Sequence, residues 1–182
     1  RSSDLTSTQF QALTTAGVGS LTTTQIDGLA SSHVAALSSA QLGALSTVQL
    51  ASMTTLQVKG FNTTNLAAIT TAQLTGFAST QLGALATTQL NALGSTNIAS
   101  LTTTQFNGLT AVQIKGINTT NFAALTTTQI GNLTTTQIKA LTSQQVGALT
   151  TTQFGSVSTT QIGSLSATQI KGLSTSNIAD LT

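Results

Sequence analysis

Residues 133–140 read Leu-Thr-Thr-Thr-Gln-Ile-Lys-Ala and are followed by Leu141; this eight-residue unit, the octad, repeats along the chain. In steps of eight from Leu5 to Leu181 every position is apolar, and so is every position in steps of eight from Phe10 to Ile178. No insertion or deletion breaks the register. A short fixed period means that each unit adopts nearly the same shape and stacks on its neighbours. We therefore expect a single octapeptide-repeat solenoid over residues 1–182, with 22 octads counted from Leu5 and no internal boundary.

The octad has the signature of a very short helix. With Leu133 as position 1, Thr134 and Gln137 at positions 2 and 5 form the Thr-x-x-Gln pattern of a capping box. Leu133 and Ile138 then stand where a hydrophobic staple needs them, and Ile138 and Leu141 are helical i,i+3 neighbours. The sequence predicts an all-α solenoid of very short capped helices, one per octad, with positions 1 and 6 inside.

A β-solenoid is the alternative. The abundance of Thr favours strands, and stacked Gln or Asn at position 5 would form amide rows. Pairs such as Asp27-Gly28 and Asn107-Gly108 are turn-like, although Gly83-Ala84 occupies the same positions and is a poor turn.

Two further columns indicate how the octads pack. Position 8 is Ala, Gly or Ser in 20 of 22 octads, which predicts a close approach between coils, whereas the variable position 7 should face solvent. At position 2 the hydroxyl is missing in Ala30, Ala78, Ala86 and Gly94. The Ser or Thr at position 3 is then a candidate replacement cap.

A longer period of seven octads is also visible. It relates Lys59, Lys115 and Lys171, and likewise the three position-5 asparagines Asn65, Asn121 and Asn177. A duplicated 56-residue block explains it, and so would a partner that docks at every seventh octad.

Composition excludes several classes of protein. Only 4% of residues are charged and the net charge is +2, from lysines that look scattered along the sequence, so nucleic acid is not an expected partner. Cys is absent, which excludes disulfides and thiolate metal sites. We expect no membrane span, because no apolar run approaches the length of about 18 residues that a spanning helix needs. We find no signal peptide. Neither end carries a capping pattern, so we expect a longer repetitive protein.

Residues suited to catalysis or metal binding are few. His33, the single histidine, lies in the position-5 column as a substituted polar spacer, and the acids are Asp4, Asp27 and Asp180, with no Glu. A metal site needs several convergent ligands, and a nucleophilic Ser needs a base within reach. All six Phe residues fall in the two core columns. We therefore predict no catalytic, cofactor-binding or metal residues, no cofactor, and a protein that is not an enzyme.

Segments such as Leu101–Phe106 and Leu125–Ile130 carry the motif Leu-Thr-Thr-Thr-Gln-apolar. Over residues 5–182 the chain resembles the short Leu-(Ser/Thr)-x-x-Gln-(Ile/Val)-x-(Ala/Gly) repeats of very long secreted or surface proteins of Gram-negative bacteria. The resemblance implies an adhesin-like, matrix or appendage-forming role, an extracellular or cell-surface location, and no catalytic residue.

These observations lead to one expected function and two alternatives. We expect a structural protein, acting as a stiff spacer or as a filament or matrix subunit that self-associates end to end or laterally. The alternative is an ice-binding protein that presents ranks of Thr. A scaffold for glycans is the third reading, since Asn62-Thr63-Thr64 and Asn118-Thr119-Thr120 match Asn-x-Thr.

Overall fold

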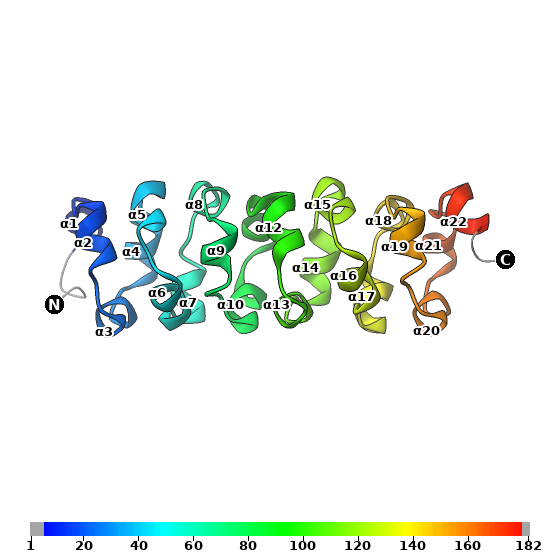
Figure 1. The fold of residues 1–182 in the computed structure, drawn as a ribbon, viewed down its shortest axis with the longest axis horizontal. Helices are drawn as coiled ribbons and strands as arrows, with labels where there is room; N and C mark the ends of the chain where they lie inside the picture. The colour runs from blue at the N-terminus through cyan, green and yellow to red at the C-terminus, as the bar shows by residue number, and fades with distance from the viewer. Residues whose placement is uncertain (1–5, 180–182) are drawn as a thin grey trace.

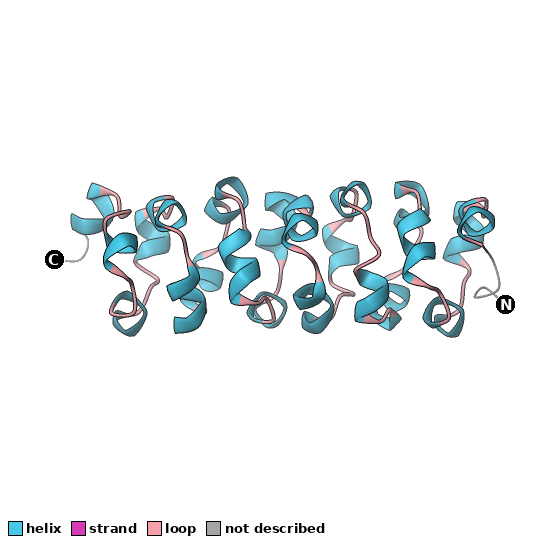
Figure 2. Ribbon diagram, turned by 180° about the vertical axis from the view of Figure 1, so that it is seen from behind, coloured by secondary structure: helices cyan, strands magenta, loops and turns pink. Residues whose placement is uncertain are grey.

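The chain forms an elongated rod, in which short helices wind around the long axis as a solenoid (Figure 1). The structure, a computed structural model, describes residues 6–179. Within that range all regular elements are helices of four to seven residues and no strand occurs (Figure 2). The predicted all-α solenoid is confirmed, and the β-solenoid alternative is wrong.

One helix corresponds to each octad, as predicted. The helices are α1 (Ser7–Gln11), α2 (Thr15–Gly19), α3 (Thr23–Asp27), α4 (Ser31–Ala36), α5 (Ser39–Gly43), α6 (Thr47–Ser52), α7 (Thr55–Val58), α8 (Thr63–Ala67), α9 (Thr71–Leu74), α10 (Ser79–Ala84), α11 (Thr87–Ala92), α12 (Gly94–Ser100), α13 (Thr103–Asn107), α14 (Ala111–Gly116), α15 (Thr119–Ala123), α16 (Thr127–Gly131), α17 (Thr135–Ala140), α18 (Ser143–Gly147), α19 (Thr151–Phe154), α20 (Thr159–Ile162), α21 (Ala167–Ile170) and α22 (Thr175–Ala179).

Helix α17 shows how the octad makes its helix. The backbone N–H of Gln137 donates to the Thr134 hydroxyl at 3.2 Å, and the Thr134 N–H donates to Gln137 Oε1 at 2.8 Å. This is the predicted capping box. The Ile138 N–H donates to the Thr134 carbonyl, and the Leu141 N–H closes the turn on the Ile138 carbonyl at 3.1 Å. So short a helix is unstable alone, and the caps satisfy backbone groups that it leaves open.

The replacement cap at position 3 was predicted wrongly. In α4, α10 and α11 the N-cap remains at position 2, on Ala30, Ala78 and Ala86, so the half of the capping box that the N-cap side chain supplies is missing. The hydroxyl at position 3 already belongs to the helix, where it does not face the open N–H groups. At Gly94 the helix begins one residue early, with Leu93 as N-cap and a glycine φ of 78°.

A full coil of the solenoid takes 28 residues, or 3.5 octads. Side-chain hydrogen bonds between neighbouring coils join residues 25 to 31 apart, and the commonest separation is 28. Each helix accordingly packs against the helix three further along the chain. Because 3.5 is not a whole number, successive coils are staggered by half an octad.

Two coils bring the octads back into line. Helices seven apart in sequence, such as α1, α8, α15 and α22, lie along the same edge of the rod in Figure 1. The second period of the sequence, seven octads, therefore equals two coils.

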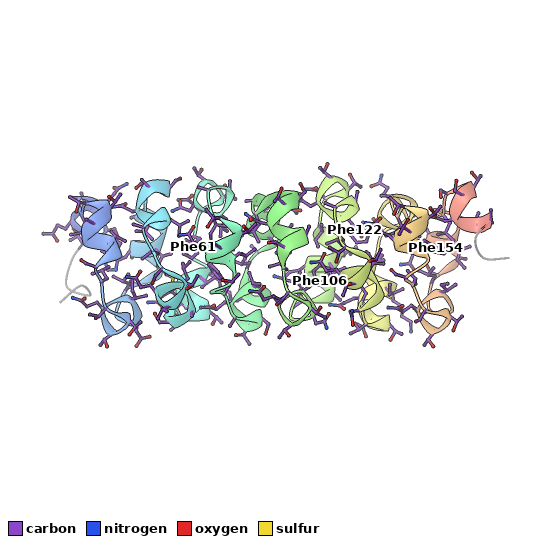
Figure 3. All side chains as sticks on the ribbon, in the orientation of Figure 1. Phe61, Phe106, Phe122 and Phe154 are labelled. Atoms are coloured by element: carbon purple, nitrogen blue, oxygen red, sulfur yellow. The ribbon has the colours of Figure 1, made fainter. Side chains whose placement is uncertain are left out.

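Both apolar columns form one continuous core along the rod. From Phe10 to Phe154 every position-6 side chain is buried, and the position-1 side chains from Leu29 to Val157 are at most 8% exposed. Figure 3 shows Phe61, Phe106, Phe122 and Phe154 inside the rod at successive points along its length.

The expected close approach at position 8 is confirmed at the glycines. A Cβ on Gly76 would lie 2.5 Å from the Thr47 carbonyl oxygen, and one on Gly108 would lie 2.5 Å from Ser79 Cβ, each in the preceding coil. Position 7 is exposed in most octads, as predicted.

Candidate functional site

The most extensive set of polar contacts is formed by the position-5 glutamines. Gln113 is 4% exposed, and its Oε1 accepts from the Thr110 N–H at 2.8 Å. Its Nε2 donates to the carbonyls of Leu82 at 2.9 Å and Leu85 at 2.8 Å in the preceding coil. One amide thus caps its own helix and binds the coil before it.

We call the position-5 side chains from His33 to Asn177 the amide column, after its predominant members. All of them are buried. The position-1 carbonyl 28 residues earlier accepts from Gln41, Gln49, Gln57, Gln73, Gln81, Gln89, Gln105, Gln113, Gln129, Gln137, Gln145, Gln153, Gln161 and Gln169. Buried carbonyls without a partner cost free energy, so the column stabilises every junction between coils that it spans.

Asparagine in the column shows which of the two roles persists. The Asn65 Nδ2 donates to the Leu37 carbonyl at 2.8 Å, and the Asn65 N–H donates to the side chain of the N-cap, Asn62 Oδ1, as the Gln N–H does to Thr elsewhere. The reciprocal bond from the N-cap N–H to the position-5 side chain is missing in this helix. The shorter side chain keeps the bond between coils and does not reach its own N-cap.

His33 is a buried substitute for glutamine in the amide column. It is 5% exposed, its Nδ1 accepts from the Ala30 N–H at 3.0 Å, and its ring lies 5.4 Å from that of Phe10. It therefore takes the capping role of glutamine in the amide column.

His33 and Asp27 are the histidine and the acidic residue that lie within the described range. No group of three His, Asp, Glu or Cys residues suited to a metal ion occurs between residues 6 and 179, and the same range contains no pocket. Asp27 is exposed, and the predictions for Asp4 and Asp180 lie outside the described residues. The described helices include none long and apolar enough to cross a membrane.

The outer surface is dominated by hydroxyl groups. Position 4 is exposed in every octad described, and Thr fills it in 13 of 22 octads. Caps are made at position 2, so the position-4 hydroxyls are available to solvent or to a partner.

A family model for the ALTTAQ repeat matches residues 3–39, 34–71, 103–135 and 131–159, which together cover more than half of the chain. The chain belongs to the ALTTAQ repeat family. Comparison with curated proteins and with solved structures gives no match. The last two matches of the ALTTAQ repeat begin at positions 103 and 131, which lie one coil apart. The unmatched stretch from 72 to 102 holds three of the four octads that lack a position-2 hydroxyl or amide, namely those of Ala78, Ala86 and Gly94.

Sequence reasoning missed the bond between coils, although a signal for it was present. A capping box accepts Glu as readily as Gln, and a carboxylate near a helix N-terminus is favourable. Yet this ALTTAQ repeat chain has no Glu. The column requires an N–H donor, which a carboxylate lacks.

Proposed function

We propose that this ALTTAQ repeat region is a structural, non-catalytic element, a stiff spacer in a secreted or cell-surface protein. The observation that carries the proposal is the amide column, which joins coil to coil along the rod through buried hydrogen bonds. The polar groups of the column bind backbone carbonyls inside the rod and do not face solvent. This arrangement favours a mechanical, structural role over recognition of a small ligand. The surface location rests on the resemblance to long bacterial surface repeats.

Rigidity is tested by small-angle X-ray scattering on the purified chain. A stiff rod gives a constant cross-section and a length set by its 6.5 coils, since the chain has 182 residues and each coil takes 28 residues. At the usual 8–10 Å between packed helices the length is about 52–65 Å. A profile typical of a flexible coil, or of a compact globule, would contradict the spacer.

The same rod is suited to self-association at its ends. Each coil covers the apolar face of the coil before it, and Ile170 (47% exposed) and Ile178 (48% exposed) are the position-6 side chains that no described coil follows. At the other end Gln9 is exposed and caps its own helix through Oε1. A second copy placed end to end would cover apolar surface and extend the amide column.

Sedimentation velocity over a range of concentrations tests this association. We expect Ile170→Lys with Ile178→Lys to abolish any concentration-dependent species. The control is Val112→Lys, because Val112 is 73% exposed on the side of the rod. A wild-type chain that stays monomeric at millimolar concentration would refute the filament function, while the spacer function would still stand.

Ice binding is a second candidate, favoured by the exposed position-4 hydroxyls that no cap uses. The half-octad stagger weakens it, because equivalent threonines align only at every second coil. Thermal hysteresis in a dilute solution is the test, and its absence at micromolar protein would end this alternative.

A further inference from the structure

The four described lysines lie along one side of the rod. Lys59, Lys115 and Lys171 are spaced seven octads apart, which is two coils, so they fall on a single line parallel to the axis. Lys139 lies three octads after Lys115, half an octad short of a full coil, and stands in the intervening coil beside that line. All four are exposed. Lysines that look scattered in the sequence are therefore aligned by the coil.

The three lysines on the line share a surrounding structure. Each is followed by a position-8 glycine, Gly60, Gly116 or Gly172, which packs closely against a position-3 residue of the preceding coil. Those residues are Ser31, Thr87 and Ser143, also seven octads apart. A cation and a neighbouring hydroxyl residue thus recur together at every second coil.

Helix chemistry alone does not explain this placement. A lysine at the C-terminal end of a helix interacts favourably with the helix dipole, and position 7 provides that setting. But all 22 octads provide this setting equally. Because seven octads complete two coils, their position-7 side chains face seven different directions around the rod. The lysines occupy two adjacent directions of the seven. The duplicated 56-residue block places Lys59, Lys115 and Lys171 on one line, and Lys139 falls on the adjacent line, which it shares with Asp27.

The spacing of the charges decides the class of partner. Coils packed at about 8–10 Å place the aligned lysines about 16–20 Å apart, with Lys139 between two of them. Duplex DNA carries a charge about every 1.7 Å and draws on dense basic surfaces, which this row does not offer. At position 4 of the same octads, Thr136 and Thr168 present hydroxyls, while Leu56 and Val112 are exposed apolar side chains. A linear polymer with well-separated negative charges, hydroxyl groups and apolar ring faces matches this combination.

We propose that the row of Lys59, Lys115, Lys139 and Lys171 is a docking surface for a linear acidic polysaccharide that lies along the rod. The carboxylates of the sugar chain pair with the ammonium groups, the hydroxyls of Thr136 and Thr168 hydrogen-bond to sugar hydroxyls, and Leu56 and Val112 lie against the apolar faces of the sugar rings. The proposal is independent of the spacer and filament functions, since it concerns the side of the rod and not its ends.

Co-sedimentation with sodium polygalacturonate at low ionic strength tests the proposal, with neutral dextran beside it. Wild type should bind the acidic polymer and not dextran. Four contacts limit the dependence on salt, so the slope of log K against log salt should be no steeper than about −4. Replacing all four lysines by Gln should weaken binding at least tenfold, with an unchanged circular dichroism spectrum.

A matched variant separates the row from the net charge. It carries the same four Lys→Gln changes together with Gly43→Lys, Thr75→Lys, Ala99→Lys and Gly155→Lys. All four are position-7 residues. Counted from the nearest octad that faces the same way as that of Lys59, they lie two octads earlier or two octads later in the chain, which places them on the opposite side of the rod. The two sides are compared at equal net charge. We expect this variant to bind as weakly as the neutralised one.

Three outcomes would overturn the proposal: no binding of wild type at low salt, equal binding by the redistributed variant, or tighter binding to single-stranded DNA or to vesicles containing phosphatidylserine than to polygalacturonate. The last outcome would assign the row to a nucleic acid or to a membrane surface.

Discussion

At the scale of the residue, one side chain determines both the local and the long-range structure. Glutamine has an acceptor that reaches its own N-cap and a donor that reaches the coil before it, and no other residue type has both at that length. In Gln113 the donor faces two carbonyls, those of Leu82 and Leu85, at 2.9 and 2.8 Å. The capping role was predictable from the Thr-x-x-Gln spacing. The second role was not, because its acceptors belong to the preceding coil, more than three octads away in sequence.

Gln113→Glu isolates the donor. The carboxylate still caps α14, but it places an oxygen against the carbonyls of Leu82 and Leu85 and buries a negative charge with no positive charge to pair with it. We expect a loss of about 3–5 kcal/mol in the free energy of unfolding at pH 7. Urea denaturation followed by circular dichroism measures it.

Gln9→Glu is the matched control, because Gln9 is exposed and its Oε1 makes the same capping bond. We expect that change to be neutral or slightly stabilising. Burial beside two carbonyls raises the pKa of the carboxyl introduced at position 113, so the protonated form is the one that fits. Stability should be restored below the unfolded-state pKa of about 4.3 and lost as pH rises through the raised value. Equal losses in both variants would refute a buried donor.

At the scale of the element, the octad predicts its helix but not the coil. Spacings of five and three residues, the capping box and the staple are local, and each is resolved within about one octad. The number of octads per coil depends on how one helix is set against the next. Backbone contacts at position 8, such as Gly76 against Thr47, fix that geometry. The sequence shows only that the residue is small.

Gly76→Ala tests that contact between helices of adjacent coils. Its Cβ would lie 2.5 Å from the Thr47 carbonyl oxygen and 2.8 Å from Thr47 Cα, both backbone atoms, so the coils must separate. We expect a loss of about 1–3 kcal/mol in the free energy of unfolding.

Gly43→Ala is the control, since a Cβ at Gly43, the last residue of α5, meets nothing within 4 Å. Alanine is the better helix former by about 1 kcal/mol, so this variant should be unchanged or more stable in the same urea titration. A Gly76→Ala variant as stable as Gly43→Ala would show that position 8 is small for another reason.

At the scale of the whole molecule, the period of seven octads acquires a geometric meaning. Seven octads are the smallest whole number that completes whole coils, so a block of that length repeats the side of the rod as well as the fold. The duplication read from Lys59, Lys115 and Asn65, Asn121 is compatible with this. The sequence could not place the lysines on one line, because their alignment depends on the length of the coil, which only the contacts between coils reveal.

Removal of residues 59–114 should therefore excise two coils and leave the rest intact. Val58 is joined to Lys115, positions 6 and 7 of an octad, and Gly116 inherits the partner of Gly60, which is Ser31. We expect the maximum dimension from X-ray scattering to fall by about 16–20 Å, with the cross-section and the ellipticity per residue unchanged. Because each coil contacts only its neighbours, unfolding should stay cooperative, with an m-value lowered in proportion to length.

Removal of residues 59–110 is the control for register. It deletes half an octad less than the removal of residues 59–114, so more of the chain remains. Val58 then meets Ala111, and Gln113 falls three residues after Val58, where the octad requires an apolar position-1 side chain. A polar group takes the place of a buried Leu, and the coils on the two sides are out of step by half an octad. This shorter deletion should lower the urea midpoint well below that of the seven-octad deletion, because core continuity depends on register and not on length. If both deletions unfold at the same midpoint, the coils do not stack through a continuous core, and the rod is a chain of independent segments.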